Sequence, residues 1–197
     1  IISASRSTDI PAFYADWFFD RLEKGYSAWT NPFNGVKSYV SYDKTRFIVF
    51  WSKNPYPLLD SLHILEERNI KCYIQYTLND YESEKLEKVP SLEKRIETFK
   101  LLVERLGKGS IEMSSVSIIG SKRQTTEPSI DDLLAKVQNI GDKLKGYTEK
   151  LVFSYADIAL YKKVKANLER SGIAYHEWTE EQMEIFVQKL SAMNRER

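Results

Sequence analysis

The clearest pattern in the chain is the apolar run Phe47-Ile48-Val49-Phe50-Trp51, which is followed at once by Ser52-Lys53-Asn54-Pro55. An uninterrupted run of this kind is typical of a strand that is buried on both faces of a helix-covered parallel sheet. Pro55 and Pro57 disfavour further strand and suit the start of a helix. Lys53 and Asn54 are therefore expected just past the carboxyl end of a buried strand, where α/β proteins bind ligands.

The same succession of a strand, a polar step and an amphipathic helix recurs along the chain. The expected strands are 1–5, 26–29, 47–51, 71–77, 111–119 and 150–155, with a seventh extended segment at 173–178. The stretch 35–44 interrupts the alternation and is expected to be a small inserted ribbon. Between the other strands, apolar positions at helical spacing predict the connecting helices.

Strands and helices that alternate in this way form a parallel sheet with helices outside it. The predicted fold class is therefore α/β. Six or seven units favour a (β/α) TIM-barrel-like fold, an incomplete barrel of six to seven parallel strands with outer helices, over a flat doubly wound sheet. The chain contains no glycine-rich phosphate loop, which weakens a nucleotide-binding alternative. Its 197 residues show no internal linker, so a single domain over 1–197 is expected.

The composition narrows the class of protein further. Hydrophobic residues are 42% and charged residues 29%, which excludes a disordered chain, and no apolar run is long enough to span a bilayer. The single cysteine, Cys72, and the lack of a visible signal peptide predict a cytoplasmic protein. A net charge of +1 gives no electrostatic argument for a nucleic-acid partner. The expected partner is a small-molecule ligand, and the oligomeric state is left open.

The carboxyl ends of the barrel strands would bring polar side chains together at one mouth. Arg6 and Lys53 are expected to bind a carboxylate or phosphate. Asp9 or Asp157 would fix Arg6 or accept a proton. The candidate catalytic residues are Asp9, Lys53 and Asp157, and the candidate substrate-binding residues are Arg6, Asn31, Asn54, Gln75 and Thr77.

Each candidate also has a purely structural interpretation. Asp9 precedes Ile10-Pro11 and suits a helix N-cap, and it is an equally good structural partner for Arg6. Asn54 suits a turn before proline, and Lys53 suits a solvated loop. The Lys/Glu-rich stretch 82–88 is also interpreted as a solvated loop.

The remaining reactive residue types predict little chemistry. Cys72 begins an expected strand and is interpreted as a core residue rather than as a nucleophile. The two histidines, His63 and His176, have no metal-ligand spacing, so no metal site is expected.

Several stretches carry a resemblance to a known family: residues 1–13, Asn31-Pro32-Phe33-Asn34 and residues 49–55, with Gly146-Tyr147-Thr148 and residues 153–157 in addition. They resemble an uncharacterised prokaryotic family, domain of unknown function 1848, over nearly the whole chain. The resemblance implies a TIM-barrel relative of radical S-adenosylmethionine enzymes that ends in a cysteine-rich, iron–sulfur ligand segment. It implies no particular substrate or reaction.

The chain departs from this family pattern in two places. It ends at Arg197 without the cysteine-rich segment, so no cofactor is evident in the chain itself. An iron–sulfur cluster and S-adenosylmethionine are expected only in a form of the protein that carries such a tail. Secondly, a Trp-Arg-(Phe/Tyr)-Asp-Pro motif of the family is absent from 111–120.

The expected function is therefore that of a radical-SAM-like iron–sulfur enzyme whose barrel mouth binds a small polar or anionic ligand. Two alternatives stay open. One is a cluster-independent barrel lyase or hydrolase that uses two of the carboxylates and Lys53. The other is a non-catalytic ligand-binding barrel.

Overall fold

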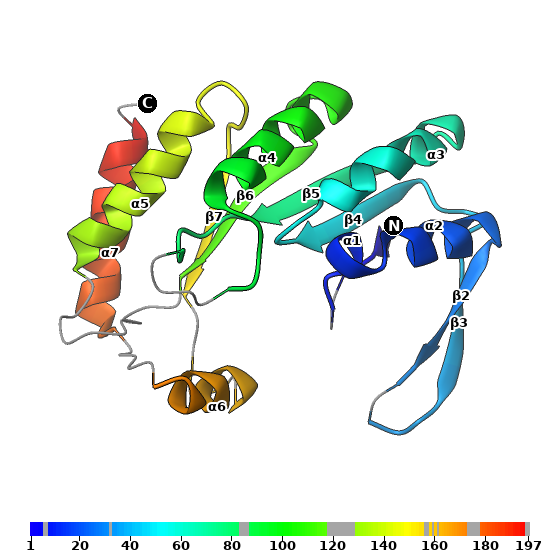
Figure 1. Ribbon diagram of the computed structural model, residues 1–197, viewed down its shortest axis with the longest axis horizontal. Helices are drawn as coiled ribbons and strands as arrows, with labels where there is room; N and C mark the ends of the chain where they lie inside the picture. The colour runs from blue at the N-terminus through cyan, green and yellow to red at the C-terminus, as the bar shows by residue number, and fades with distance from the viewer. Residues whose placement is uncertain are drawn as a thin grey trace.

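The computed structural model describes residues 1–5, 8–31, 33–82, 87–117, 129–155, 158, 160, 162–172 and 178–195 (Figure 1). Its main sheet has five parallel strands in the order β1-β4-β5-β6-β7. These strands are β1 (Ile2–Ser3), β4 (Phe47–Ser52), β5 (Lys71–Thr77), β6 (Ile111–Ser117) and β7 (Leu151–Tyr155). The helices are α1 (Ile10–Phe13), α2 (Ala15–Glu23), the 3-10 helix η1 (Tyr56–Ser61), α3 (Leu62–Glu67), α4 (Leu92–Leu106), α5 (Ile130–Lys143), α6 (Lys162–Arg170) and α7 (Glu180–Arg195).

The TIM-barrel-like fold with six to seven parallel strands is not what the chain forms, and that prediction is wrong. In the described part of the chain the parallel sheet has five strands, and β1 and β7 are its two unpaired edges. The expected second strand is absent from this sheet, because β1 pairs directly with β4. Of the expected seventh segment, residues 173–177 lie outside the described residues.

The expected second strand belongs instead to an antiparallel ribbon, here called the β2–β3 ribbon. It consists of β2 (Tyr26–Thr30) and β3 (Lys37–Ser41), with Tyr26 opposite Ser41 and Thr30 opposite Lys37. Residues 31–36 connect the two strands, and a parallel crossover needs a connection of a dozen or more residues. The inserted ribbon expected at 35–44 is therefore confirmed for β3, and it includes the preceding strand as well.

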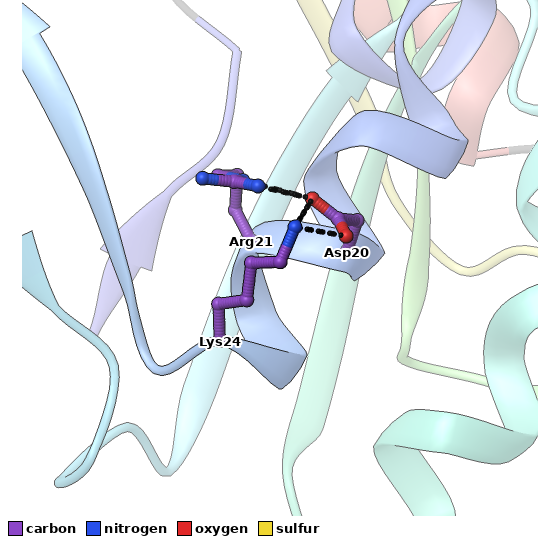
Figure 2. Close-up of polar contacts among 3 residues, drawn as sticks. All are labelled: Asp20, Arg21 and Lys24. Atoms are coloured by element: carbon purple, nitrogen blue, oxygen red, sulfur yellow. Dashed lines mark hydrogen bonds and ion pairs between the residues drawn. The ribbon is translucent and has the colours of Figure 1, made fainter.

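Helix α2 ends beside the base of this ribbon in a small cluster of charges (Figure 2). The carboxylate of Asp20 accepts hydrogen bonds from Arg21 Nε at 2.9 Å and from Lys24 Nζ at 3.1 Å. Hydrogen bonds from Lys24 and then Arg21 hold the pKa of the Asp20 carboxyl below its usual value. Arg21 and Lys24 are thus already paired with Asp20.

The hydrophobic core lies between the main sheet and its helices. Ile48, Phe50 and Ile74 are fully buried there. Figure 1 shows α3, α4 and α5 on one side of the strands. Trp51, which points to the other face by strand alternation, exposes 52% of its surface. The expected burial of this strand on both faces is therefore met on one face only.

Candidate functional site

Asp9 joins two loops at the carboxyl edge of the sheet. One of its carboxylate oxygens accepts the backbone N–H of Ala12 at 3.0 Å, and the other accepts the backbone N–H of Lys53 at 2.8 Å. The first contact confirms that Asp9 is the N-cap of α1, where Pro11 sits in the first turn. The second fixes the loop that follows β4 against the loop that follows β1. A role for Asp9 in proton transfer stays a prediction.

Lys53 contributes its side chain to a polar cluster with residues from the loop after β5. Its Nζ contacts Glu87 Oε1, and Asn79 Nδ2 donates to the same oxygen at 3.2 Å. The Glu87 side chain is only 9% exposed, whereas that of Lys53 is 44% exposed. The cluster therefore presents a half-exposed ammonium group whose charge is balanced by a largely buried carboxylate.

Glu87 and Asn79 were missed by reasoning from the sequence. Glu87 belongs to the Lys/Glu-rich stretch 82–88, so its composition indicated a solvated loop, and that interpretation is wrong for Glu87. Glu82 is also engaged, because it contacts the backbone N–H of Leu92 at the start of α4. Asn79 is 4% exposed and lies two residues past β5. Its place directly after a buried strand was a signal that could have found it.

Asn54 supplies a polar atom without a partner at the same edge. Its backbone N–H donates to Ser52 Oγ at 3.0 Å, which confirms a turn at this point. Its side-chain Oδ1 is buried and accepts no hydrogen bond within the described residues. Buried polar atoms are nearly always hydrogen-bonded, and an unpaired one costs about 1–3 kcal/mol. Asn54 is thus a candidate acceptor for a group outside the described residues.

Arg95 holds the loop that carries Asn79 and Glu87. This arginine of α4 is 1% exposed, and it donates from Nε to the Pro90 carbonyl at 2.9 Å and from Nη2 to the Asn79 carbonyl at 2.8 Å. Its guanidinium therefore ties together the two ends of the loop between β5 and α4. Next to it, burial raises the pKa of the Tyr76 hydroxyl well above its usual value, and the Tyr76 ring stacks on Phe99.

The other predicted site residues are dispersed. Gln75 and Thr77 are half-buried residues of β5, on the face opposite to the buried Tyr76. Asn31 lies in the turn of the β2–β3 ribbon, where its Oδ1 accepts the backbone N–H of Phe33, so the fold does not place it at the carboxyl edge of the main sheet. Arg6 and Asp157 lie outside the described residues.

The thiol of Cys72 does not suit a metal or nucleophile site. The residue is 7% exposed on the helix-covered face of β5, and burial followed by the charge of Glu66 raises its pKa to about 11. The interpretation of Cys72 as a core residue is confirmed. Within the described ranges no group of three or more His, Cys, Asp or Glu side chains could hold a metal ion. With one thiol, and that one protonated, these residues do not fit an iron–sulfur cluster.

Two pockets lie away from the polar cluster. One of about 340 Å³ is lined by Leu144, Gly146 and Leu151, at the start of β7. Another of about 430 Å³ is lined by Phe47 and Cys72, at the start of β4 and β5. Their linings hold neither Lys53 nor Glu87. The site is therefore placed by its polar groups, since ligands of open parallel sheets bind at the carboxyl ends of the strands.

These features define an α/β protein with an open parallel sheet and a polar cluster at the carboxyl edge of β4 and β5. The chain belongs to the family described as Domain of unknown function (DUF1848), whose model matches residues 1–197. A search of curated proteins and a search of solved structures found no match. In the described part of the chain no helix has the length and apolar character needed to cross a membrane.

Proposed function

We propose that this domain binds a small polar ligand at the carboxyl edge of its sheet, at the cluster of Lys53, Asn54, Asn79 and Glu87. The Lys53–Glu87 pair carries the proposal, because the half-exposed Lys53 side chain is held by a largely buried carboxylate and offers a ligand a positioned hydrogen-bond donor. An ion pair with a largely buried carboxylate is weak evidence for a role in stability, because the cost of desolvating the carboxylate offsets much of the attraction. Ligand binding therefore explains this ion pair better than a contribution to stability does.

The charge balance narrows the ligand class. Glu87 offsets the charge of Lys53, and Asn54 Oδ1 offers an acceptor rather than a donor. A phosphate or carboxylate would meet one balanced cation and an amide oxygen, which is poor electrostatic complementarity. A neutral ligand with hydroxyl or amide groups suits both the donor and the acceptor.

The same pair also suits proton transfer. Lys53 Nζ and Glu87 Oε1 are in direct contact, so the pair offers a ligand a proton donor and a proton acceptor side by side. This favours a cluster-independent lyase or hydrolase as the second candidate function. A radical S-adenosylmethionine reaction rests on the family resemblance alone, and no step through an iron–sulfur cluster is derived from these residues.

The test is a titration of the labelled protein followed by backbone amide NMR. The probes are glycerol and acetamide as neutral compounds, inorganic phosphate and acetate as anions, and S-adenosylmethionine. We expect shifts of the Lys53, Asn54 and Asn79 amides with the neutral probes, and their loss in Lys53→Met. Lys189→Met is the matched control, because Lys189 also forms a half-exposed ion pair, with Asp131, between α7 and α5. Stronger binding of phosphate than of the neutral probes, or shifts confined to other regions, would contradict the proposal.

A further inference from the structure

The β2–β3 ribbon projects from the body of the molecule and is held only at its base (Figure 1). Tyr42, which directly follows β3, donates from its hydroxyl to Ser27 Oγ at 2.8 Å and packs its ring against Phe18 of the core. Apart from Ser27, which belongs to this anchor, every residue of the two strands is exposed. An isolated two-stranded hairpin is marginally stable at best in water. The projecting part of the ribbon would therefore gain stability from a further strand or another packing partner.

Apolar side chains are concentrated on this ribbon. Phe33 at its turn is 96% exposed, and Tyr39 in β3 is 68% exposed. The other large hydrophobic residues exposed between positions 26 and 40 are Tyr26, Trp29, Val36 and Val40. Tyr26 and Tyr39 lie on one face of the ribbon, whereas Trp29 and Val40 lie on the other, because opposed residues of a strand pair share a face. Exposed apolar side chains gathered on a projecting element mark an interaction site.

The outer edge of β3 also offers unpaired backbone groups. The N–H of Tyr42 donates to the Gly25 carbonyl, and the carbonyl of Val36 accepts from Asn31, so even-numbered positions face β2. Because strand residues alternate, the N–H and C=O groups of Lys37, Tyr39 and Ser41 point away from β2. In the described part of the chain β3 has β2 as its one neighbour. This edge is a template for a further strand.

We propose that β3 pairs antiparallel with β3 of a second copy of this chain, around a two-fold axis at Tyr39, so that two ribbons form one four-stranded sheet. In this register Lys37 lies opposite Ser41 of the second copy and diagonal to its Asp43. Lys37 and Ser41 share one face, since they are separated by even steps along the strand. Asp43 lies in the turn after β3, and its carboxylate is held beside Ser41 by the hydrogen bond that Ser41 Oγ donates at 3.0 Å. Each contact occurs twice by symmetry, which is the self-complementarity that a two-fold interface requires.

The charges and rings of the ribbon favour a second copy as the occupant. Lys37 forms no ion pair within the described residues, and the exposed carboxylate of Asp43 accepts one hydrogen bond, from Ser41 Oγ. The nearby Arg21 and Lys24 are already paired with Asp20 (Figure 2). On the same face Tyr26 and Tyr39 have ring centroids 6.1 Å apart, and the two-fold axis extends this pair to a row of four tyrosines.

Sedimentation equilibrium over a wide concentration range tests the dimer. We expect a mass that rises from 23.0 kDa to twice that value. Lys37→Asp and Asp43→Lys should each weaken dimerisation about tenfold or more, because an attractive diagonal pair becomes repulsive at two places. The double variant K37D/D43K should restore the original dissociation constant. Lys108→Asp, in an exposed turn after α4, changes the net charge equally and should leave the dimer unchanged.

A cross-linking measurement tests the position of the axis independently. A cysteine at Tyr39→Cys should be joined to its counterpart by a short bifunctional thiol reagent, since opposed residues of an antiparallel pair lie about 5.5 Å apart. Ala28→Cys, on the outer edge of β2, is the matched control and should cross-link far less. A constant mass of 23.0 kDa, a double variant that stays weakened, or equal cross-linking at the two positions would each overturn the proposal.

Discussion

The two faces of β4 and β5 differ sharply although they belong to the same strands. On the helix-covered face Phe50 is fully buried, whereas its neighbour Trp51 on the other face is 52% exposed. A run of five apolar residues looks the same from either side in the sequence, yet in the described part of the chain Phe50 is packed under helices and Trp51 is not. Stability is therefore concentrated in alternate residues of the run. Within the described residues, Trp51 of the other face stays half in contact with water.

Truncation of these two neighbours should give the largest contrast. Phe50→Ala removes a fully buried ring and should lower the free energy of unfolding by about 4 kcal/mol, because a cavity remains in the core. Trp51→Ala should lower it by about 1 kcal/mol or less, since half of the indole already contacts water. Urea unfolding of both variants checks this contrast. Equal losses would show that the face of Trp51 is covered in solution.

The helix-covered side of the sheet also contains a buried charge, the guanidinium of Arg95. It provides a second comparison between a buried residue and an exposed one. Arg95→Leu should cost about 3 kcal/mol, because it leaves the carbonyls of Pro90 and Asn79 without their donors. Arg105→Leu on the same helix is the matched control and should cost less than about 1 kcal/mol, since Arg105 forms an exposed ion pair with Glu66. Chemical denaturation of the two variants gives the difference. A loss from Arg95→Leu as small as that of the control would mean that other contacts hold the loop.

Local features of the fold could be predicted from the sequence, and long-range pairing could not. The strand at Phe47–Trp51 and the N-cap Asp9 depend on residues within a few positions of each other, and the structure confirms them. The barrel failed because the strand at 26–29 forms a hairpin with β3, for which Asn34-Gly35 is a local signal, and because β1 pairs over a long range with β4.

The candidate site likewise contains residues whose place could be predicted from the sequence and residues whose place could not. Lys53 and Asn54 follow a clear strand, so their place at the carboxyl edge could be predicted. Glu87 comes from a charged loop whose composition is that of a solvated segment, and only the contact with Lys53 shows its role. Asn31 was expected at the mouth of a barrel. Because its strand belongs to the β2–β3 ribbon, Asn31 lies in the turn of that ribbon instead.

Cys72 provides a test of burial on the helix-covered face through its effect on stability at alkaline pH. Its pKa is raised to about 11 in the folded chain, from an ordinary value of 9.0, mainly by burial. Between these two pH values the unfolded chain binds fewer protons, so the free energy of unfolding falls as the pH rises. The loss should reach about 2 kcal/mol near pH 11 and be absent below pH 8.

The measurement compares the pH dependence of the unfolding free energy in the unaltered protein with that in Cys72→Ala. The variant starts lower because of its cavity, but the gap should narrow as the pH rises above 9. A gap that stays constant up to pH 11 would mean that the thiol ionises in the folded state and is exposed to water.

Asp9 tests whether the carboxyl edge differs from an ordinary helix start. Asp9→Ala should cost about 1.5 kcal/mol, because it removes both the cap of α1 and the acceptor for the Lys53 N–H. Ser91→Ala, which removes the cap of α4, should cost about 1 kcal/mol. The two variants should differ more in structure than in stability: Asp9→Ala alone should shift the backbone amide resonances of Lys53 and Asn54, since Asp9 fixes their loop. If Ser91→Ala shifts those resonances as strongly, the edge is held by the sheet as a whole, and Asp9 is a helix cap without a special link to the site.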